Sequence, residues 1–381
     1  MRRFIVLDSF RGICALCVVF HHFNVRGSIT EWGLFRNATF MVEFFFVLSG
    51  FVLTHAYSKR DFDFAALKKF AITRTFRLFP LHIIMLIVFI FLELAKLIAQ
   101  SKGIDFNKPA FSGVNAPMQI LPNILLLQSW LTSAATLSFN YPSWSISVEY
   151  YLYAIFAIVL LFAQKTKCSL IAIFLIISCV GFLGLLAPVL LLLKTEALSG
   201  LACFFGGAIT YMIYAKSHPE KLSRLAFSIL EVISILICYY SVTLSYEYKD
   251  IFTSVVFCAT IYIFSFEIGV LSTVLKRAVF EFFGKISFSI YMTHAAVIFV
   301  AVSLAMGVEK LLGYSLTYSV TTKTGSTLRY IDLGNVLYNN VFALSLLAVI
   351  IAVSYVSYNI IEVRSISAGK KYTKNKMTTT Q

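Results

Sequence analysis

Two ionisable side chains in the first apolar segment have the types and the spacing to act in one reaction. Arg11 and His22 are eleven residues apart, which on a helix places them about 20° from superposition and roughly 16 Å apart along the axis. A guanidinium binds anions, and an imidazole accepts a proton near neutral pH. Asp8 lies one turn before Arg11 and can pair with it, whereas His21 points about 100° away. The alternative is an arginine that anchors the helix and a histidine that is hydrogen-bonded within a bundle.

Two later segments place charges among apolar side chains. Glu43 lies in an apolar run in which a Ser-Gly pair, beginning at Ser49, permits close helix contact. Arg74 and Arg77 are at i and i+3, so they share a helix face and suit bidentate binding of a phosphate. Pro80 can open the following helix at its first turn. The alternative for the two arginines is anchoring at the cytoplasmic surface.

Polar groups also enter two segments nearer the C-terminus. Ser147, Glu149 and Tyr151 fall within one apolar run, and Glu149 alone is compatible with a buried acid that pairs two helices. Tyr291 and His294 are at i and i+3 and therefore share a face. A histidine hydrogen-bonded within the bundle is the alternative for His294.

Composition defines the elements that must position these groups. Of the 381 residues, 59% are hydrophobic and 13% are charged, and the mean hydropathy is +0.84. A soluble chain of this size cannot bury so much apolar surface, and disordered, coiled-coil and nucleic-acid-binding proteins are excluded because they are more polar or periodic. The seven cysteines lie singly, without metal-ligand spacing. We expect an all-α polytopic membrane protein without a metal site.

About ten transmembrane helices are predicted, because a span needs about 20 mostly apolar residues. A shorter apolar stretch near 119–131 is expected to be a re-entrant or interfacial segment. The predicted spans are 10–24, 40–57, 78–99, 146–163, 169–193, 197–215, 225–244, 251–270, 286–306 and 335–361.

The distribution of positive charge predicts the orientation. With both termini in the cytoplasm, 21 Lys and Arg residues fall on the inner side and nine on the outer side, as the positive-inside rule requires. The net charge of +14 therefore indicates topology and contact with anionic membrane lipids, not nucleic-acid binding. We expect one transmembrane domain over 1–364 and a disordered basic cytoplasmic tail over 365–381.

Five motifs in order resemble those of the acyltransferase-3 family of integral membrane acyltransferases, over essentially the whole chain. Asp8 to His22 is similar to that family's Asp-Gly-Leu-Arg opening and Arg-x10-His signature. The others are Val42–Phe51, Arg74–Pro80, Trp144–Tyr153 and Ser287–His294. Glutamate at position 43 and tyrosine at position 150 replace acids that are usual in the family.

The resemblance implies transfer of an acyl group, usually acetyl, from cytosolic acyl-CoA to a hydroxyl of an extracytoplasmic glycan or glycolipid. In this scheme Arg74 and Arg77 hold CoA phosphates, and Arg11 holds the pyrophosphate or a pantetheine amide. The thioester then lies near His22, which acts as general base on the acceptor hydroxyl. An acyl-histidine intermediate and direct transfer are both compatible with the sequence.

Supporting roles follow from the same scheme. Ser147 or Tyr151 could donate a hydrogen bond to the tetrahedral oxyanion, and Glu43 or Glu149 could orient the imidazole. Asp8, Tyr291 and His294 are expected as further substrate contacts.

A transporter or flippase for a glycan or lipid-linked substrate is the competing function, since intramembrane ions also line permeation paths. Against it, the sequence has no internal repeat. A structural or sensory membrane protein is a third alternative. Some family members carry an appended extracytoplasmic hydrolase-like domain, which we do not expect here, so a partner protein is a candidate for the extracytoplasmic step. The expected location is the bacterial cytoplasmic membrane.

Overall fold

The computed structural model describes residues 2–187, 192–217, 223–321 and 327–378. Each of the ten predicted spans falls on a helix, although the end of the 169–193 prediction reaches beyond the described residues. The corresponding helices are α1 (Ile5–His22), α3 (Phe40–Tyr57), α4 (Phe64–Ser101), α6 (Ser143–Thr166), α7 (Leu170–Leu186), α8 (Thr195–Tyr214), α9 (Arg224–Thr243), α10 (Lys249–Ser265), α12 (Ala278–Leu312) and α13 (Val336–Ser357).

Within the described ranges, eight helical stretches are long and apolar enough to cross a membrane. The other two helices, α7 and α10, have 17 residues each. The protein is therefore an all-α polytopic membrane protein. The number of ten crossings remains a prediction, as does the cytoplasmic location of the termini.

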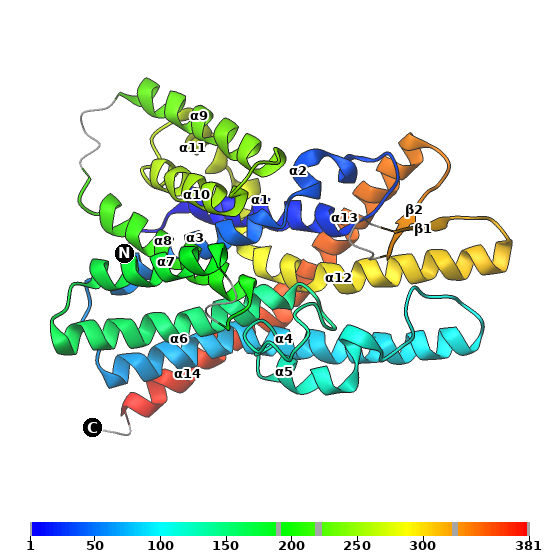
Figure 1. Ribbon diagram of the computed structural model, residues 1–381, viewed down its shortest axis with the longest axis horizontal. Coiled ribbons are helices and arrows are strands. Elements are labelled where there is room, and N and C mark those ends of the chain that lie inside the picture. Colours follow the sequence, from blue (N-terminus) through cyan, green and yellow to red (C-terminus); the bar gives the residue numbers. More distant parts are fainter. Residues whose placement is uncertain (1, 188–191, 218–222, 322–326, 379–381) are drawn as a thin grey trace.

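Close contacts show which helices run in the same direction. Gly12 on α1 lies against Gly284 on α12, and ten residues further along each helix His22 stacks on His294, so α1 and α12 are parallel. An alternating path of ten crossings gives these two helices the same direction. Figure 1 shows the two chain ends at one end of the bundle.

Glycines permit the closest of these helix contacts. A Cβ added at Gly50 on α3 would lie 1.8 Å from the Phe204 carbonyl oxygen on α8, and one at Gly12 would lie 2.7 Å from the Gly284 nitrogen. Small residues allow backbones to approach in this way. The Ser49-Gly50 pair is thus a close-contact point, as the sequence predicted.

Helix α4 differs from its prediction in length. It has 38 residues and contains Pro80 in its interior, so it is roughly 57 Å long and extends beyond a hydrocarbon core of about 30 Å. The expectation that Pro80 opens a helix is wrong, because Asp63 caps the start of α4 by accepting a hydrogen bond from the Ala66 nitrogen at 2.8 Å. Arg74 and Arg77 therefore lie inside a continuous helix.

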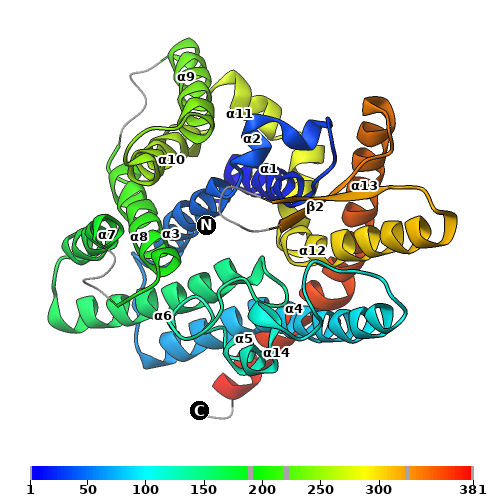
Figure 2. The same ribbon diagram turned by 45° about the vertical axis from the view of Figure 1, so that its right-hand side comes forward.

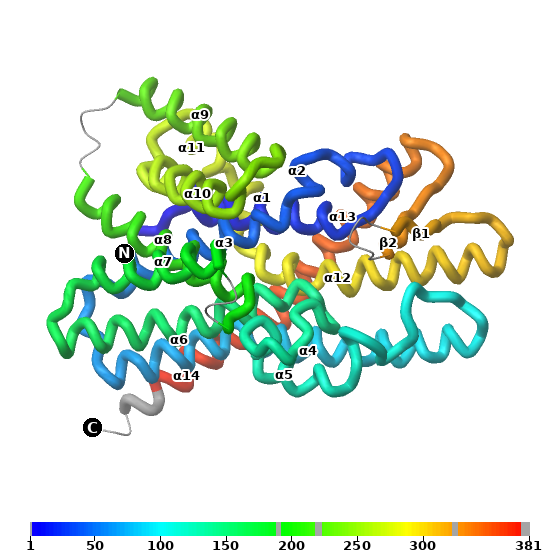
Figure 3. Tube along the Cα trace, viewed as in Figure 1, coloured from blue at the N-terminus to red at the C-terminus, as the bar shows by residue number. Residues whose placement is uncertain are grey.

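The segment between α4 and α6 does not form a span. It contains 3-10 turns at Gly113–Asn115 and Pro117–Gln119, and the short helix α5 (Ile120–Ile124). The His82 ring of α4 lies 2.7 Å from the Asn123 carbonyl oxygen, and Figure 3 traces the segment along α4 to the start of α6.

Other short elements were not predicted. An antiparallel hairpin of β1 (Thr317–Thr321) and β2 (Thr327–Ile331) meets the end of α1 through a bridge between Val25 and Ile331. The connections also contain α2 (Gly33–Arg36), a 3-10 turn at Ile29–Glu31 and α11 (Val270–Leu275).

The predicted disordered tail is wrong for its described part. After a π-helical turn at Tyr358–Glu362, residues Val363–Thr378 form helix α14, which packs on α4. Gly369 and Thr373 are buried on the packed side, while Lys370, Lys371 and Lys374 are exposed, so the basic residues did not prevent a helix. Residues 379–381 lie outside the described part.

Candidate functional site

A cavity lies where α1, α3, α4, α6 and α12 meet; Figure 2 shows these five helices around the middle of the bundle. Its volume is about 60 Å3, room for a few water molecules. The residues that line it are Arg11, Val42, Phe45, Phe46, Ser49, Arg77, Leu78, Ser145, Ile146, Glu149, Ser287, Phe288 and Tyr291.

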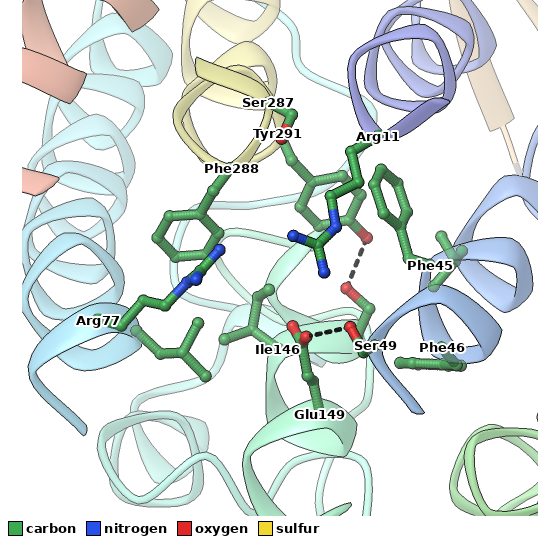
Figure 4. A pocket seen from close by; sticks show the side chains of 13 residues that line it. Arg11, Phe45, Phe46, Ser49, Arg77, Ile146, Glu149, Ser287, Phe288 and Tyr291 are labelled. Atoms are coloured by element: carbon green, nitrogen blue, oxygen red, sulfur yellow. Dashed lines mark hydrogen bonds between the residues drawn. The ribbon is translucent and has the colours of Figure 1, made fainter. Parts of the chain in front are cut away.

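Two guanidiniums point into this cavity from different helices (Figure 4). The Arg11 side chain is 19% exposed, and its nearest carboxylate oxygen, on Asp8, is 3.9 Å away. Arg77 makes no hydrogen bond or ion pair of 4 Å or less with any described residue, although Glu149 and Glu362 lie near enough to act on its charge. Glu149 contributes the single carboxylate of the lining. The cavity therefore carries excess positive charge and suits an anionic ligand.

Glu149 is held in place by two hydroxyls. Its Oε1 accepts a hydrogen bond from Ser49 Oγ at 2.8 Å and a short one from the Tyr153 hydroxyl. The Ser49 contact joins α3 to α6, and the Tyr153 contact lies within α6. Glu149 is thus a fixed part of the cavity wall.

Arg74 does not join Arg77 as the i, i+3 spacing predicted. Its guanidinium lies over the rings of Phe70 and Tyr153, at 5.3 and 5.2 Å from the ring centres, and is not part of the cavity lining. Two aromatic faces offer a cation a favourable position within the protein. The paired guanidiniums of the structure are Arg77 and Arg11.

Asp8 connects α1 to the start of α12. Its carboxylate accepts a hydrogen bond from Arg3 Nε at 2.8 Å, and Arg3 also contacts Glu281 at 2.8 Å. The hydrogen bond to Asp8 raises the pKa of Arg3. The predicted ion pair of Asp8 with Arg11 is present, but its N–O distance of 3.9 Å is longer than the 2.8 Å between Asp8 and Arg3. Arg3 is therefore the closer partner of Asp8.

His22 lies among three other rings at the far end of α1. The ring centres of Tyr141, His21 and His294 are 4.7, 4.8 and 5.4 Å away. His22 is half-buried, and no described residue forms a hydrogen bond with either of its ring nitrogens. The imidazole is therefore available to a ligand.

Packed rings on α12 lie between the cavity and His22. Tyr291 lines the cavity and its hydroxyl accepts a hydrogen bond from Ser145 at 2.8 Å. The ring centres of Tyr291 and His294 are 5.9 Å apart, and His294 stacks on His22. His22 itself is not in the cavity lining. The face of α1 that Arg11 and His22 share, the Arg11–His22 stripe, therefore has a cavity end and a separate histidine end.

His21 has the different surroundings that its position predicted. Its Nδ1 lies 3.1 Å from the Phe35 carbonyl oxygen, which ties α1 to α2. This contact gives His21 a structural role.

Two expected supporting roles for acids are not found. Glu43 accepts hydrogen bonds from Ser199 at 3.0 Å and Ser254 at 3.3 Å, so it links α3 to α8 and α10. Glu149 lies in the cavity wall. Neither carboxylate contacts the His22 imidazole, because the Glu43 carboxylate is held by hydroxyls of α8 and α10 and the Glu149 carboxylate by hydroxyls of α3 and of its own helix.

The two expected oxyanion donors are also committed elsewhere. Ser147 donates to the Leu126 carbonyl oxygen at 2.5 Å, and Tyr151 donates to the Leu125 carbonyl oxygen at 3.0 Å. The segment between α4 and α6 supplies both acceptors. Both hydroxyl hydrogens are therefore engaged with backbone carbonyl oxygens.

Sequence reasoning missed three residues of this region. Asn140 and Tyr141 lie just before α6, separated from it by Pro142. The sequence feature that could have drawn attention to them is this pair of polar side chains directly before a proline. Glu362 is 5% exposed in the π-helical turn and accepts a hydrogen bond from Ser289 at 2.9 Å. Its signal was an acid at the end of an apolar run.

Metal-binding clusters of three or more His, Cys, Asp or Glu side chains are absent from the described ranges.

Comparison of the chain with known protein families gives a match over most of its length. A family model described as an acyltransferase domain matches residues 4–359.

Two curated proteins match parts of the chain. Acyltransferase MdmB of Streptomyces mycarofaciens is 35% identical over 116 residues, which are 30% of this chain and 26% of that protein. Protein 2 in picA locus of Rhizobium radiobacter is 38% identical over 88 residues, 22% of this chain and 42% of that protein. The chain thus spans less than half the length of either relative. No solved structure matches.

Proposed function

The chain belongs to the acyltransferase-3 family, and from that premise we propose that it is a membrane O-acyltransferase that moves an acetyl group from acetyl-CoA to a hydroxyl of an extracytoplasmic glycan or glycolipid. One observation carries this proposal. The guanidiniums of Arg77 and Arg11 face a central cavity, and Tyr291 of its lining contacts His294, which stacks on the half-buried His22.

The donor end of the site is the cavity. CoA carries several phosphate charges, and arginine is the side chain best suited to bind phosphate. Arg11 and Arg77 approach from two helices, so they can hold one anionic group between them. Glu149 opposes them and limits how many anionic groups the cavity can take.

The thin pantetheine arm of CoA suits the distance to the histidine end. Arg11 and His22 are separated by roughly 16 Å along α1. A donor whose anionic end lies at Arg11 therefore has to reach along α1, past Tyr291, to bring its thioester to His22. Asp8, through Arg3 and Glu281, positions the helix end that carries Arg11.

The chemistry at the histidine end is general-base catalysis. A ring nitrogen of His22 takes the proton of the acceptor hydroxyl while its oxygen attacks the thioester carbonyl. The tetrahedral intermediate then expels the CoA thiolate, which receives the proton from the imidazolium, and the new ester remains on the acceptor. Tyr141, next to His22, is the candidate donor to the oxyanion in place of Ser147 and Tyr151.

The acceptor approaches from the end of α1 that bears the hairpin and α2, the outer end in the proposed topology. Both named relatives come from bacteria, which supports the bacterial cytoplasmic membrane as the location. A partner protein that delivers or receives the acyl group on the outer side fits this arrangement.

Transfer of labelled acetyl groups tests the proposal. Membranes from cells with and without the gene are incubated with acetyl-CoA labelled in the acetyl group, and label is followed into non-protein material. Gene-dependent release of CoA thiol together with labelled, alkali-labile ester is expected. Membranes that consume no thioester would refute an acyltransferase and leave the transporter or flippase as the function to test.

A further inference from the structure

Two buried polar atoms, one on a residue that stacks on His22 and one on the residue before Tyr141, have no hydrogen-bond partner in the described part of the chain. They are Nε2 of His294 and Oδ1 of Asn140, and the two residues are 0% and 1% exposed. Asn140 contacts the turn of α12 that carries His294, since its Nδ2 donates to the Met292 carbonyl oxygen at 3.1 Å. Buried polar atoms are nearly always paired, so each of these two unpaired atoms requires an explanation.

The chemical character of both atoms follows from their partners. His294 Nδ1 lies 3.1 Å from the Ile290 carbonyl oxygen, and a carbonyl oxygen only accepts, so the ring hydrogen is assigned to Nδ1. Nε2 of the neutral ring is then an acceptor. The Asn140 amide is oriented in the same way by Met292, which leaves Oδ1 as an acceptor.

A single reacting hydroxyl cannot satisfy these atoms and also engage the general base. It has one hydrogen, which must point to His22 for proton removal. The two unpaired acceptors therefore match hydroxyl groups other than the reacting one. A simple alcohol has no such groups, whereas a sugar ring has several.

We propose that His294 and Asn140 form the acceptor-binding site, in which Nε2 and Oδ1 each accept a hydrogen bond from a non-reacting hydroxyl of a polyhydroxylated acceptor. This inference rests on the proposed function and deepens it, because it assigns the residues that form hydrogen bonds with the acceptor. The stacked rings of His294 and His22, with 5.4 Å between centres, place those hydroxyls beside the base. His294 thereby binds the substrate, while His22 moves the proton.

Substitutions at His294 separate a hydrogen-bond acceptor from a packing ring. His294→Phe keeps a ring but removes Nε2, and His294→Gln keeps an oxygen acceptor. In the labelled-acetyl assay with native membranes, we expect His294→Phe to lose about tenfold or more in rate and His294→Gln to recover most of it. His22→Gln should not be rescued in this way. The apparent KM for acetyl-CoA should not change in either His294 variant.

Asn140→Leu provides the second arm. If both residues hold one ligand, the double variant with His294→Phe should lose less than the product of the two single losses, because groups that share a partner are not additive. Equal rates for His294→Phe and wild type would overturn the inference, as would equal losses in the Phe and Gln variants. A wild type that transfers nothing would instead refute the proposed function.

A direct measurement on the resting protein is independent of activity. The full chain labelled with 15N-histidine, purified in detergent, should show His294 as the neutral Nδ1–H tautomer with an unprotonated Nε2 at about pH 7, with the signal assigned by its absence in His294→Gln. Addition of methyl glucoside as a polyhydroxyl probe should shift the Nε2 resonance, and 1-propanol should not. A hydrogen on Nε2, or an Nε2 resonance already shifted by an ordered water only, would overturn the assignment.

Discussion

Removal of one of the two cavity guanidiniums gives a prediction whose size can be worked out. Arg77 has no hydrogen bond or ion pair of 4 Å or less to another described residue, so its donors are available to a ligand phosphate. A hydrogen bond to a charged group contributes about 1.5–3 kcal/mol, and 1.4 kcal/mol corresponds to a factor of ten in Kd. Arg77→Ala should therefore weaken acetyl-CoA binding about 10- to 150-fold. Arg77→Lys should recover only part, because lysine lacks the planar fork.

Arg74 provides the matched control on the same helix. Its guanidinium lies over Phe70 and Tyr153 outside the cavity, so Arg74→Ala should lower thermal stability while changing the Kd by less than about threefold. Isothermal titration of purified protein with acetyl-CoA measures both constants. A larger loss of affinity in Arg74→Ala than in Arg77→Ala would show that the anionic end of the donor binds elsewhere.

Three further predictions concern topology, packing and pH. A membrane-impermeant maleimide should label Lys108→Cys but not Lys59→Cys in intact cells, above the background of the native cysteines; the reverse pattern would invert the orientation. Gly50→Ala should destabilise the protein by about 1–3 kcal/mol or more, because its Cβ would lie 1.8 Å from a backbone oxygen. Gly307→Ala is the control and should not destabilise it, since no atom lies within 4 Å of the added Cβ. Equal melting temperatures of the two variants would refute the close contact at Gly50. Hydrogen bonds, chiefly from the Asn339 side chain, lower the pKa of Asp332 below 3.8. Its contribution to stability should thus be complete above that value and lost as the pH falls through the lowered pKa, and Asp332→Asn should remove this pH dependence of the melting temperature.

The features that the sequence predicted are those that depend on local periodicity. Hydropathy placed the ten long helices because a span must be apolar over its own length. The Arg11–His22 stripe and the separate direction of His21 followed from the rotation per residue within one helix. Tyr291 likewise faces the cavity from the helix that carries His294.

The features that it missed depend on contacts between distant segments. By spacing, Arg74 shares a helix face with Arg77. In the structure, however, the Arg74 guanidinium lies over the ring of Tyr153, which belongs to another helix. Ser147 and Tyr151 lost their expected role because carbonyl oxygens of an irregular segment accept their hydroxyl hydrogens. The hairpin and α14 are stabilised by docking on α1 and α4, which no local pattern of theirs reveals.

The central claim is that His22 is the base that activates the acceptor, and one comparison tests it most directly. Acetyl transfer is measured in native membranes that hold equal amounts of wild type, His22→Ala and His21→Ala. We predict that His22→Ala loses about 10²–10⁴-fold in rate with normal acetyl-CoA binding, whereas His21→Ala, whose ring bonds to the Phe35 carbonyl oxygen, stays largely active. An inactive His21→Ala beside an active His22→Ala, or full activity in both, would contradict the account.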